Sequence, residues 1–359
     1  MGSGDDPGGS WLREAATRVS TLLISSSAKQ TRRGAPRRAI PELQGDDTFE
    51  IVWVGDILLA DAAVPSLTMH GYTWPFAHLR SLMIGDFLIG IAEGPLTDRI
   101  ERNPLQRWSY NADPRAATAL REVGFDALSL ANNHVFDRGP EGVRDTIRHL
   151  EAAGIRYFGA GMDDAQAAAP LLIETPHGVV AVLGFGDRRK YYSIASGTDP
   201  GITYFDAPSI ARGKEIAIAG GARWTIAFVH WGKNYAPVTN SQRRVAAAFA
   251  AAGYDLVIGA HPHVQQPVDV IDGMPVLYSL GNFVFGTPGR FSTDAPGYGL
   301  VVRTAIGANG VERIAVSCIL TDNAVVAFQP RPCVPEEAQR VVAGLGPRVI
   351  WDGTTGVVR

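Results

Sequence analysis

One stretch of the chain joins a short apolar run to a pair of histidines: Asp255-Leu256-Val257-Ile258-Gly259-Ala260-His261-Pro262-His263. An apolar run of this length, without polar alternation, is typical of a buried strand in a parallel sheet. Because His261 and His263 follow the run directly, we expect them at the carboxyl end of the strand. In open α/β sheets, ligands bind in the crevice beyond the carboxyl ends of the strands. This stretch therefore predicts an α/β protein with a polar site at one edge of its sheet.

The same arrangement recurs along the chain. Polar residues follow apolar runs at Asp56, at Asn133-His134 and at His230. With His261 and His263, half of the eight histidines gather at one rim. Imidazole nitrogen combined with carboxylate and amide oxygen suits Zn, Mn or Fe and disfavours Ca or Mg, which prefer oxygen ligands. A single histidine at a strand end is more often a hydrogen-bonded core residue, but this combination predicts a transition-metal site.

Apolar runs alternate with helical patterns over most of the chain. The predicted strands are residues 49–54, 125–130, 155–158, 179–185, 225–230, 255–258 and 276–279. The predicted helices are residues 114–123, 140–154 and 242–252, the last with Ser241 as its N-cap. This alternation favours a mostly parallel sheet that is covered on both faces. After Gly286, alternating runs at 299–305, 312–320 and 324–329 predict antiparallel strands on the same core.

Composition divides the chain into three parts. Residues 1–46 contain a Gly-rich start and a basic stretch, which is typical of a flexible extension. Residues 47–330 are expected to form one α/β domain. Residues 331–359 are expected to pack on this core, with a helix near Pro335–Leu345.

Overall composition excludes several classes of protein. Of 359 residues, 46% are hydrophobic and 19% charged, which indicates a globular protein. Lys and Arg number 33 against 36 Asp and Glu, a net charge of −3 that offers no electrostatic basis for binding nucleic acid. No run approaches the roughly 20 apolar residues of a membrane helix, so we expect no membrane insertion and a cytoplasmic location. Cys318 and Cys333 lack metal-ligand spacing, and we expect two unpaired core thiols rather than one bridge.

Six ordered motifs resemble the CapA family of capsule, or poly-γ-glutamate, synthesis proteins, which has the calcineurin-like metallophosphoesterase fold. The motifs are Val54–Leu59, Glu93–Pro95, Leu130–His134 with Asp137 and Gly139, His230–Gly232, Gly259–Val264 and Tyr278–Phe283. The resemblance covers about residues 50–286. It implies an αββα sandwich with mixed sheets and a metal centre at the carboxyl ends of the strands.

The resemblance also implies roles for individual residues. Six side chains would bind one or two divalent ions of Mn, Zn or Fe: Asp56, Glu93, Asn133, His230, His261 and His263. Glu93 would bridge two ions, with Asp56 and His263 on the first and the remaining three side chains on the second. His134 matches a histidine that stands near the metals without being a principal ligand, and it would donate a proton to the leaving group. Asp137 would either orient His134 by a hydrogen bond or cap the helix that begins near Pro140.

Two positions depart from the family pattern. Leu58 stands where metallophosphoesterases usually have a histidine two residues after the first aspartate. Ala92 stands where the CapA pattern usually has an asparagine before the glutamate. The first ion would therefore have fewer ligands from the protein than the second.

Two further segments are candidates for binding substrate. Arg188, Arg189 and Lys190 follow the predicted strand at 179–185, so they would hold a phosphate or carboxylate, or else form a solvated basic loop. Asn282 either lines the rim or has only a structural role in a turn.

Three functions are compatible with these features. The first is a metal-dependent hydrolase that acts on a phosphoester or a γ-glutamyl-type amide through metal-activated water. The others are a non-hydrolytic accessory of poly-γ-glutamate, capsule or peptide assembly, and a degenerate metal-binding module. The intact ligand set favours the first, whereas Leu58 and Ala92 favour the other two. The expected partner is an anionic small molecule, peptide or polymer.

Overall fold

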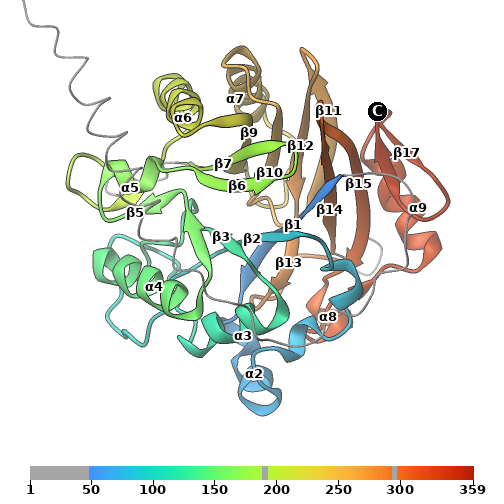
Figure 1. The fold of residues 1–359 in the computed structure, drawn as a ribbon. Coiled ribbons are helices and arrows are strands. Elements are labelled where there is room, and N and C mark those ends of the chain that lie inside the picture. The colour runs from blue at the N-terminus through green and yellow to red at the C-terminus, as the bar shows by residue number, and fades with distance from the viewer. Residues whose placement is uncertain (1–47, 188–192, 293–296) are drawn as a thin grey trace, which may run out of the picture.

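The computed structural model describes residues 48–187, 193–292 and 297–359. Two β-sheets are stacked face to face, and helices cover the outer face of each sheet (Figure 1). This is the αββα sandwich with mixed sheets that the resemblance implies.

The larger sheet supplies one half of the molecule. Its strands are β1 (Phe49–Leu58), β2 (Phe87–Ala92), β3 (Ala127–Ser129), β4 (Arg156–Phe158), β13 (Asn282–Phe285), β14 (Tyr298–Gly307), β15 (Gly310–Leu320), β16 (Arg331–Pro332), β17 (Val349–Trp351) and β18 (Gly356–Val358). Their order is β17-β18-β15-β14-β1-β2-β3-β4, with β13 beside β1 and β16 beside β15. Strands β1 to β4 are parallel, so their carboxyl ends meet at one edge, whereas β14 to β18 are antiparallel to their neighbours.

The smaller sheet supplies the other half. Its strands are β6 (Leu171–Thr175), β7 (Gly178–Gly186), β9 (Ala222–His230), β10 (Leu256–Ala260), β11 (Gln265–Ile271) and β12 (Met274–Leu280), in the order β11-β12-β10-β9-β7-β6. The four inner strands are parallel, and antiparallel edge strands flank them. A separate pair joins β5 (Ala160–Gly161) to β8 (Gly201–Ile202).

The helices of the described residues lie mainly outside the two sheets. They are α2 (Val64–His70), α3 (Arg115–Val123), α4 (Gly139–Ala153), α5 (Asp164–Ala168), α6 (Ala207–Ala219), α7 (Asn240–Ala251), α8 (Asn323–Val326) and α9 (Pro335–Gly344). Short 3₁₀ turns occupy Asp61–Ala63, Trp74–Phe76 and Arg80–Leu82. Helices α3 and α4 cover the larger sheet, and α6 and α7 cover the smaller one (Figure 1).

Strand β1 shows how the layers are held together. Ile51 and Trp53 point into the core between the sheets, where the Trp53 ring packs edge-on against Phe228 of β9 with centroids 5.6 Å apart. Val52 and Val54 point to the opposite face, toward α3 and α4. All four side chains of β1 are fully buried. Burying an apolar side chain of this size contributes roughly 1.5–3 kcal/mol, so β1 stabilises both cores that it faces.

Most of the predicted elements are present. The parallel strands lie in two mixed sheets, as the family resemblance implies, whereas the strand pattern alone favoured one mostly parallel sheet. Two local predictions are wrong. Residues 324–329 form no strand: Asp322 caps the short helix α8 by accepting a hydrogen bond from the Ala324 N–H, and Ala327 and Phe328 adopt positive φ. Helix α7 is capped by Thr239, through a capping box with Gln242, and not by Ser241.

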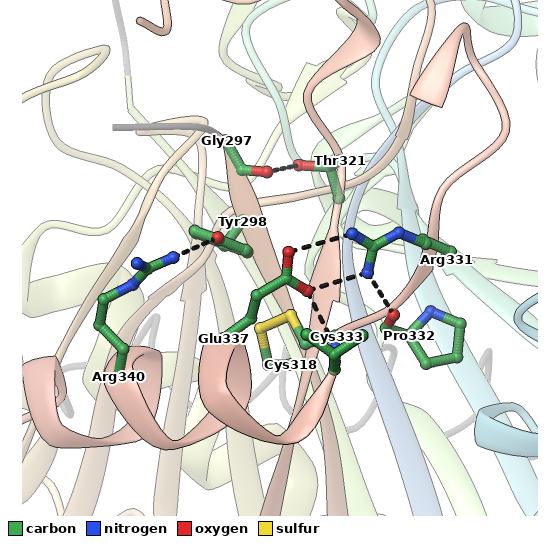
Figure 2. The surroundings of a disulfide bond; sticks show 10 residues. Gly297, Tyr298, Cys318, Thr321, Arg331, Pro332, Cys333, Glu337 and Arg340 are labelled. Carbon is green, nitrogen blue, oxygen red and sulfur yellow. Dashed lines mark hydrogen bonds and ion pairs between the residues drawn. A yellow bond between two sulfur atoms is a disulfide. The ribbon is translucent and has the colours of Figure 1, made fainter. Parts of the chain in front are cut away.

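The expectation of two unpaired thiols is also wrong, because Cys318 and Cys333 form a disulfide (Figure 2). Strand β16 pairs with β15, and the Cys333 N–H donates a hydrogen bond to the Cys318 carbonyl at 3.0 Å. This pairing brings the two Cα atoms to 5.4 Å, within the range that a disulfide requires. Figure 2 shows the bridge beside the ion pair of Arg331 and Glu337, whose Nη1 and Oε2 atoms are 2.8 Å apart.

The C-terminal residues extend the larger sheet. Strand β18 pairs with β15, and β17 pairs with β18. Val341 and Val342 of α9 lie in the core between the sheets. The predicted extension at residues 1–46 lies outside the described residues. Among those that are described, no helix combines the length and the apolar character needed to cross a membrane.

Candidate metal centre

Polar side chains from both sheets meet where the parallel strands end. The larger sheet contributes Asp56 within β1, Glu93 directly after β2 and Asn133 in the turn after β3. The smaller sheet contributes His230 at the end of β9, and His261 and His263 directly after β10. Five of the six are buried, and Asn133 is half-buried. The structure thus brings together five of the six residues that the resemblance assigns to metal ions, and Asn133 lines the same cavity as His263.

A close approach of two backbones positions Asp56. The Asp56 N–H donates to the carbonyl of Gly281 at 3.2 Å. A Cβ atom on Gly55 would lie 1.8 Å from the same carbonyl oxygen, so only glycine fits at that position. Oδ2 of Asp56 accepts a hydrogen bond from the His261 N–H at 3.1 Å. This hydrogen bond connects the carboxylate of the larger sheet to the loop of the smaller sheet that carries His261 and His263, here called the histidine loop.

Several buried polar atoms in this cluster have no hydrogen-bond partner within the described ranges. They are Oδ1 of Asp56, Oε1 and Oε2 of Glu93, Oδ1 of Asn133 and Nε2 of His230. Nε2 of His230 lies 3.4 Å from Oδ1 of Asp56 and 3.7 Å from Oε1 of Glu93. Buried carboxylates without partners are costly unless a cation compensates them. The convergence of these oxygen and nitrogen atoms fits a divalent transition metal.

The charges of the cluster shift the pKa values of its members. Burial and the nearby Glu93 raise the pKa of Asp56. Burial works to raise the pKa of Glu93 as well, but the charges of His263 and His230 outweigh it and lower the pKa to about 2. Burial works to lower the pKa of His230, yet Asp56 and Glu93 raise it to about 9. The pKa shifts of Glu93 and His230 therefore have the directions expected where buried carboxylates surround a positive charge.

Two groupings of side chains lie close enough to hold an ion. Asp56, Glu93 and His230 have ligand atoms within 4.8 Å of one another, as do Glu93, His261 and His263. Glu93 belongs to both groupings, as a bridging carboxylate must. The groupings place His230 with Asp56, whereas the resemblance implies that His230 and Asp56 bind different ions.

The histidine loop has an uncommon backbone conformation. His261 has φ +97° and His263 has φ +60°, both in the left-handed region that residues with a Cβ rarely adopt. Such strain costs roughly 1–3 kcal/mol per residue and is concentrated at functional sites. Nδ1 of His263 donates to Oδ1 of Asn282 at 2.9 Å, which leaves Nε2 to bind a ligand. Asn282 is itself buried, so it positions His263 from behind.

His134 stands beside this cluster with a fixed orientation. Its Nδ1 is 2.8 Å from Oδ2 of Asp137, and its Nε2 is 4.0 Å from Oε1 of Glu93. Oδ2 of Asp137 also accepts a hydrogen bond from the Tyr110 N–H at 2.7 Å. Helix α4 begins without a side-chain cap, so of the two roles open to Asp137 the structure has the orienting one. Burial raises the pKa of Asp137 despite its contact with His134.

Asn132 holds the turn that carries Asn133 and His134. Its Nδ2 donates to the Ala92 carbonyl at 2.7 Å, and its Oδ1 accepts from the His134 N–H at 3.0 Å. One fully buried side chain therefore connects the end of β2, next to Glu93, with the turn after β3. The sequence motif contains Asn132, but the motif alone did not indicate this positioning role.

A cavity of about 410 Å³ opens beside His134 and His263. Sequence reasoning missed several of the residues that line it: Arg107, Trp108, Tyr110, Tyr235 and Arg290. These residues lie in loops that carry no metal-binding pattern, so no local signal identified them. Arg188, Arg189 and Lys190, predicted to bind substrate, lie outside the described residues.

Two stacked sheets with helices outside them, and carboxylate, amide and imidazole side chains near the strand ends, agree with the arrangement that the sequence resemblance implies. Residues 50–287 match the model of the family described as bacterial capsule synthesis protein PGA_cap. The chain belongs to this family.

Named relatives agree with the family. The chain is 32% identical to the capsule biosynthesis protein CapA of Bacillus anthracis over 280 residues, which are 74% of this chain. They span 66% of the relative, just under two thirds of its length. This chain is 28% identical to the PGA biosynthesis protein CapA of Bacillus subtilis over 282 residues, which are 76% of this chain and 72% of the relative. A probable polyglutamine synthesis accessory protein of Mycobacterium tuberculosis is 29% identical over 206 residues, 54% of this chain and 52% of that one.

Solved structures with a similar chain path include two nucleotidases. A NAD nucleotidase of Haemophilus influenzae has 12% identity and a TM-score of 0.42, covering 83% of this chain and 62% of that one. A putative 5'-nucleotidase from Staphylococcus aureus has 14% identity and a TM-score of 0.41, covering 81% of this chain and 57% of that one.

Proposed function

We propose that the chain is a metal-dependent hydrolase that cleaves a phosphoester or a γ-glutamyl-type amide. The observation that carries this proposal is the position of His134. Its Nδ1 is held by Asp137 and its Nε2 lies 4.0 Å from Glu93, between the cluster of unpartnered ligand atoms and the cavity. A histidine with only a structural role would not need to lie beside both the cluster of ligand atoms and the cavity.

The chain's own groups have separate tasks in this proposal. The six side chains of the cluster hold one or two divalent ions, of which Mn, Zn and Fe suit the mixed nitrogen and oxygen ligands. When bound, such an ion supplies Lewis acidity and lowers the pKa of water to about 7. His134 donates a proton from Nε2 to the leaving group, while Asp137 holds the opposite ring nitrogen. Tyr110, whose ring centroid is 4.6 Å from that of His134, packs against the imidazole and restricts its movement.

A second function is supported by a different observation. Leu58 and Ala92 replace polar residues of the family pattern, and both are buried and apolar here. The Mycobacterium tuberculosis relative is named a probable synthesis accessory protein. In this alternative the cavity binds an anionic chain during polymer or peptide assembly and no bond is hydrolysed.

The variant His134→Gln separates these functions. It keeps a hydrogen-bond donor but removes the titratable proton, so metal content should be unchanged. Turnover should fall about 10²- to 10⁴-fold for substrates with poor leaving groups. The loss should be small for activated aryl esters, whose leaving groups need no proton.

Two control variants make the result interpretable. His78→Gln makes the same replacement at an exposed position and should change neither metal content nor turnover. His261→Ala should lose metal and activity together, whatever the leaving group. Loss of metal from His134→Gln would make His134 a ligand, and unchanged turnover in that variant would favour the accessory function.

A further inference from the structure

The cavity beside His134 has a one-sided charge. Its lining includes two arginines, Arg107 and Arg290, and two histidines, His134 and His263. No aspartate or glutamate is among the described residues that line it. The chain as a whole carries a net charge of −3, so this surface differs from the average of the molecule. A cavity lined in this way attracts anions.

Both arginines are presented in the same manner. Cζ of Arg107 lies 5.6 Å from the ring centroid of Trp108, and Cζ of Arg290 lies 5.5 Å from that of Tyr235. Both rings also line the cavity. Stacking holds a guanidinium by its face and leaves the N–H groups along its edge available to a ligand.

Among the described residues, no carboxylate neutralises either guanidinium by forming an ion pair with Arg107 or Arg290. Arg303 and Arg331, by contrast, each pair with a glutamate. The two cavity arginines come from separate loops, one between β2 and α3 and one after β13. They are therefore placed to contact one ligand from two loops.

An adjoining hollow of about 490 Å³ is also lined by Tyr110, but the charged residues that line it are mostly acidic. Three aspartates line it, Asp61, Asp98 and Asp113. Its single arginine among the described lining residues, Arg115, is already bound to Asp113 through two hydrogen bonds of 3.0 and 2.6 Å. An anionic group next to Tyr110 is thus favoured on the side of Arg107 and Arg290.

We propose that Arg107 and Arg290 bind an acidic group of the substrate, a carboxylate or a phosphate, that is separate from the group being cleaved. The proposal rests on the proposed function in placing the cleaved group at His134. Charge-assisted hydrogen bonds from arginine to carboxylate or phosphate are strong and geometrically selective. The substrate class is therefore an ester or amide that carries a second anionic group within the reach of this cavity.

Anion binding by the full chain tests the proposal without requiring turnover. The probes are glutarate, a dicarboxylate, and inorganic phosphate, titrated calorimetrically at low ionic strength. The variants are Arg107→Gln, Arg290→Gln and the double variant. The matched control is Arg223→Gln, an exposed arginine stacked 4.6 Å from the ring of Trp224 and absent from the cavity lining.

The double variant should weaken the binding of at least one probe by roughly 10-fold or more, since charged hydrogen bonds are lost. The control should stay within about twofold of the original chain. The probe that responds identifies the acidic group as carboxylate or phosphate. Each titration is repeated after reconstitution with Mn²⁺, so that phosphate bound by metal is separated from phosphate bound by arginine.

The outcomes distinguish this proposal from the proposed function. Equal binding by the original chain and the double variant, or no binding of either probe at about 20 mM, overturns the arginine site. Arginine-dependent binding in a chain that hydrolyses nothing supports the site and contradicts the hydrolase. Turnover with an unchanged KM in the double variant supports the hydrolase and overturns the site.

Discussion

The carboxylate of Asp137 links two segments that are distant in the sequence. Its Oδ2 atom accepts a hydrogen bond from Nδ1–H of His134 and another from the backbone N–H of Tyr110. From the sequence, Asp137 could either orient His134 or cap the helix that begins near Pro140. Its position, three residues after His134 and three before Pro140, suits both roles. The second contact had no sequence signal, because Tyr110 reaches the site only through the folding of its loop.

Asp137→Asn tests the orienting role. The amide keeps the volume of the side chain but removes the charged oxygen that accepts the hydrogen bond from Nδ1 of His134, so the imidazole is held less firmly. We expect kcat to fall about 10- to 100-fold, the usual effect of removing such a partner, with metal content unchanged. Steady-state kinetics and elemental analysis measure both quantities. Asp98→Asn, an exposed change, is the control, and equal kcat values in the two variants would remove Asp137 from the mechanism.

The residues of the candidate metal centre were predictable to different degrees. Asp56, His230, His261 and His263 follow apolar runs, so their meeting at one edge follows from strand direction alone. Glu93 was identified only through the family resemblance, because β2 itself was not predicted from its pattern. The arginines and aromatic rings of the cavity depend on loop conformation, which no spacing of residues encodes.

One side chain makes two of the hydrogen bonds that hold the loop before α3. Nη1 of Arg138 donates to Oγ of Ser109 at 2.8 Å, and Nη2 donates to Oδ1 of Asn111 at 2.6 Å. Oγ of Ser109 in turn donates to the Asp137 carbonyl at 3.0 Å. Tyr110 lies between Ser109 and Asn111, so these hydrogen bonds help to keep its ring in contact with His134.

Arg138→Met should release this loop. The apolar stem is kept, but two hydrogen bonds to partly buried acceptors are lost, so the free energy of unfolding should fall by roughly 1–3 kcal/mol. KM should also rise, because Tyr110 and Arg107 lie on the released loop. Urea denaturation and kinetics measure the two effects. Arg144→Met changes an exposed arginine of α4 and should leave both quantities unchanged; the same result for Arg138→Met would show that the loop is held by other contacts.

The disulfide joins β15 to the segment that leads into α9. The expectation of free thiols rested on the small number of cysteines, whereas strand pairing between β15 and β16 is a tertiary feature that a count cannot reveal. Structural disulfides are typical of proteins in oxidising compartments, and the cytoplasmic location expected from the sequence stays a prediction.

Removing the bridge should destabilise the domain. Its cysteines are 15 residues apart, and closing a loop of this size contributes about 3 kcal/mol through the unfolded state. Cys318→Ser combined with Cys333→Ser should therefore lower Tm, and a reducing agent should lower the Tm of the original chain to a similar value. Calorimetry with and without reductant measures this. A reductant that leaves the Tm of the original chain unchanged would contradict a stabilising disulfide.

At the scale of the whole molecule, the two sheets meet at the candidate metal centre. The larger sheet supplies the carboxylates and Asn133, and the smaller sheet supplies the histidines, so an ion would connect the two halves. The apolar pattern predicted most of the inner strands, but only the family resemblance implied their division into two sheets. Inner strands of both sheets are buried on both faces, so β1 and β9 have the same apolar pattern and nothing local indicates which sheet each one joins.

We propose that the junction of the two sheets holds a catalytic transition metal. Elemental analysis of protein purified without chelators, combined with hydrolysis assays on phosphoesters and γ-glutamyl peptides, measures whether it does. We expect between one and two equivalents of Mn, Zn or Fe per chain, with the second ion lost on dialysis because Leu58 supplies no ligand, and hydrolysis that follows metal content. His230→Ala should lose both metal and activity, while His78→Gln keeps both. Absence of any transition metal after reconstitution, or hydrolysis that is equal with and without metal, would contradict the account.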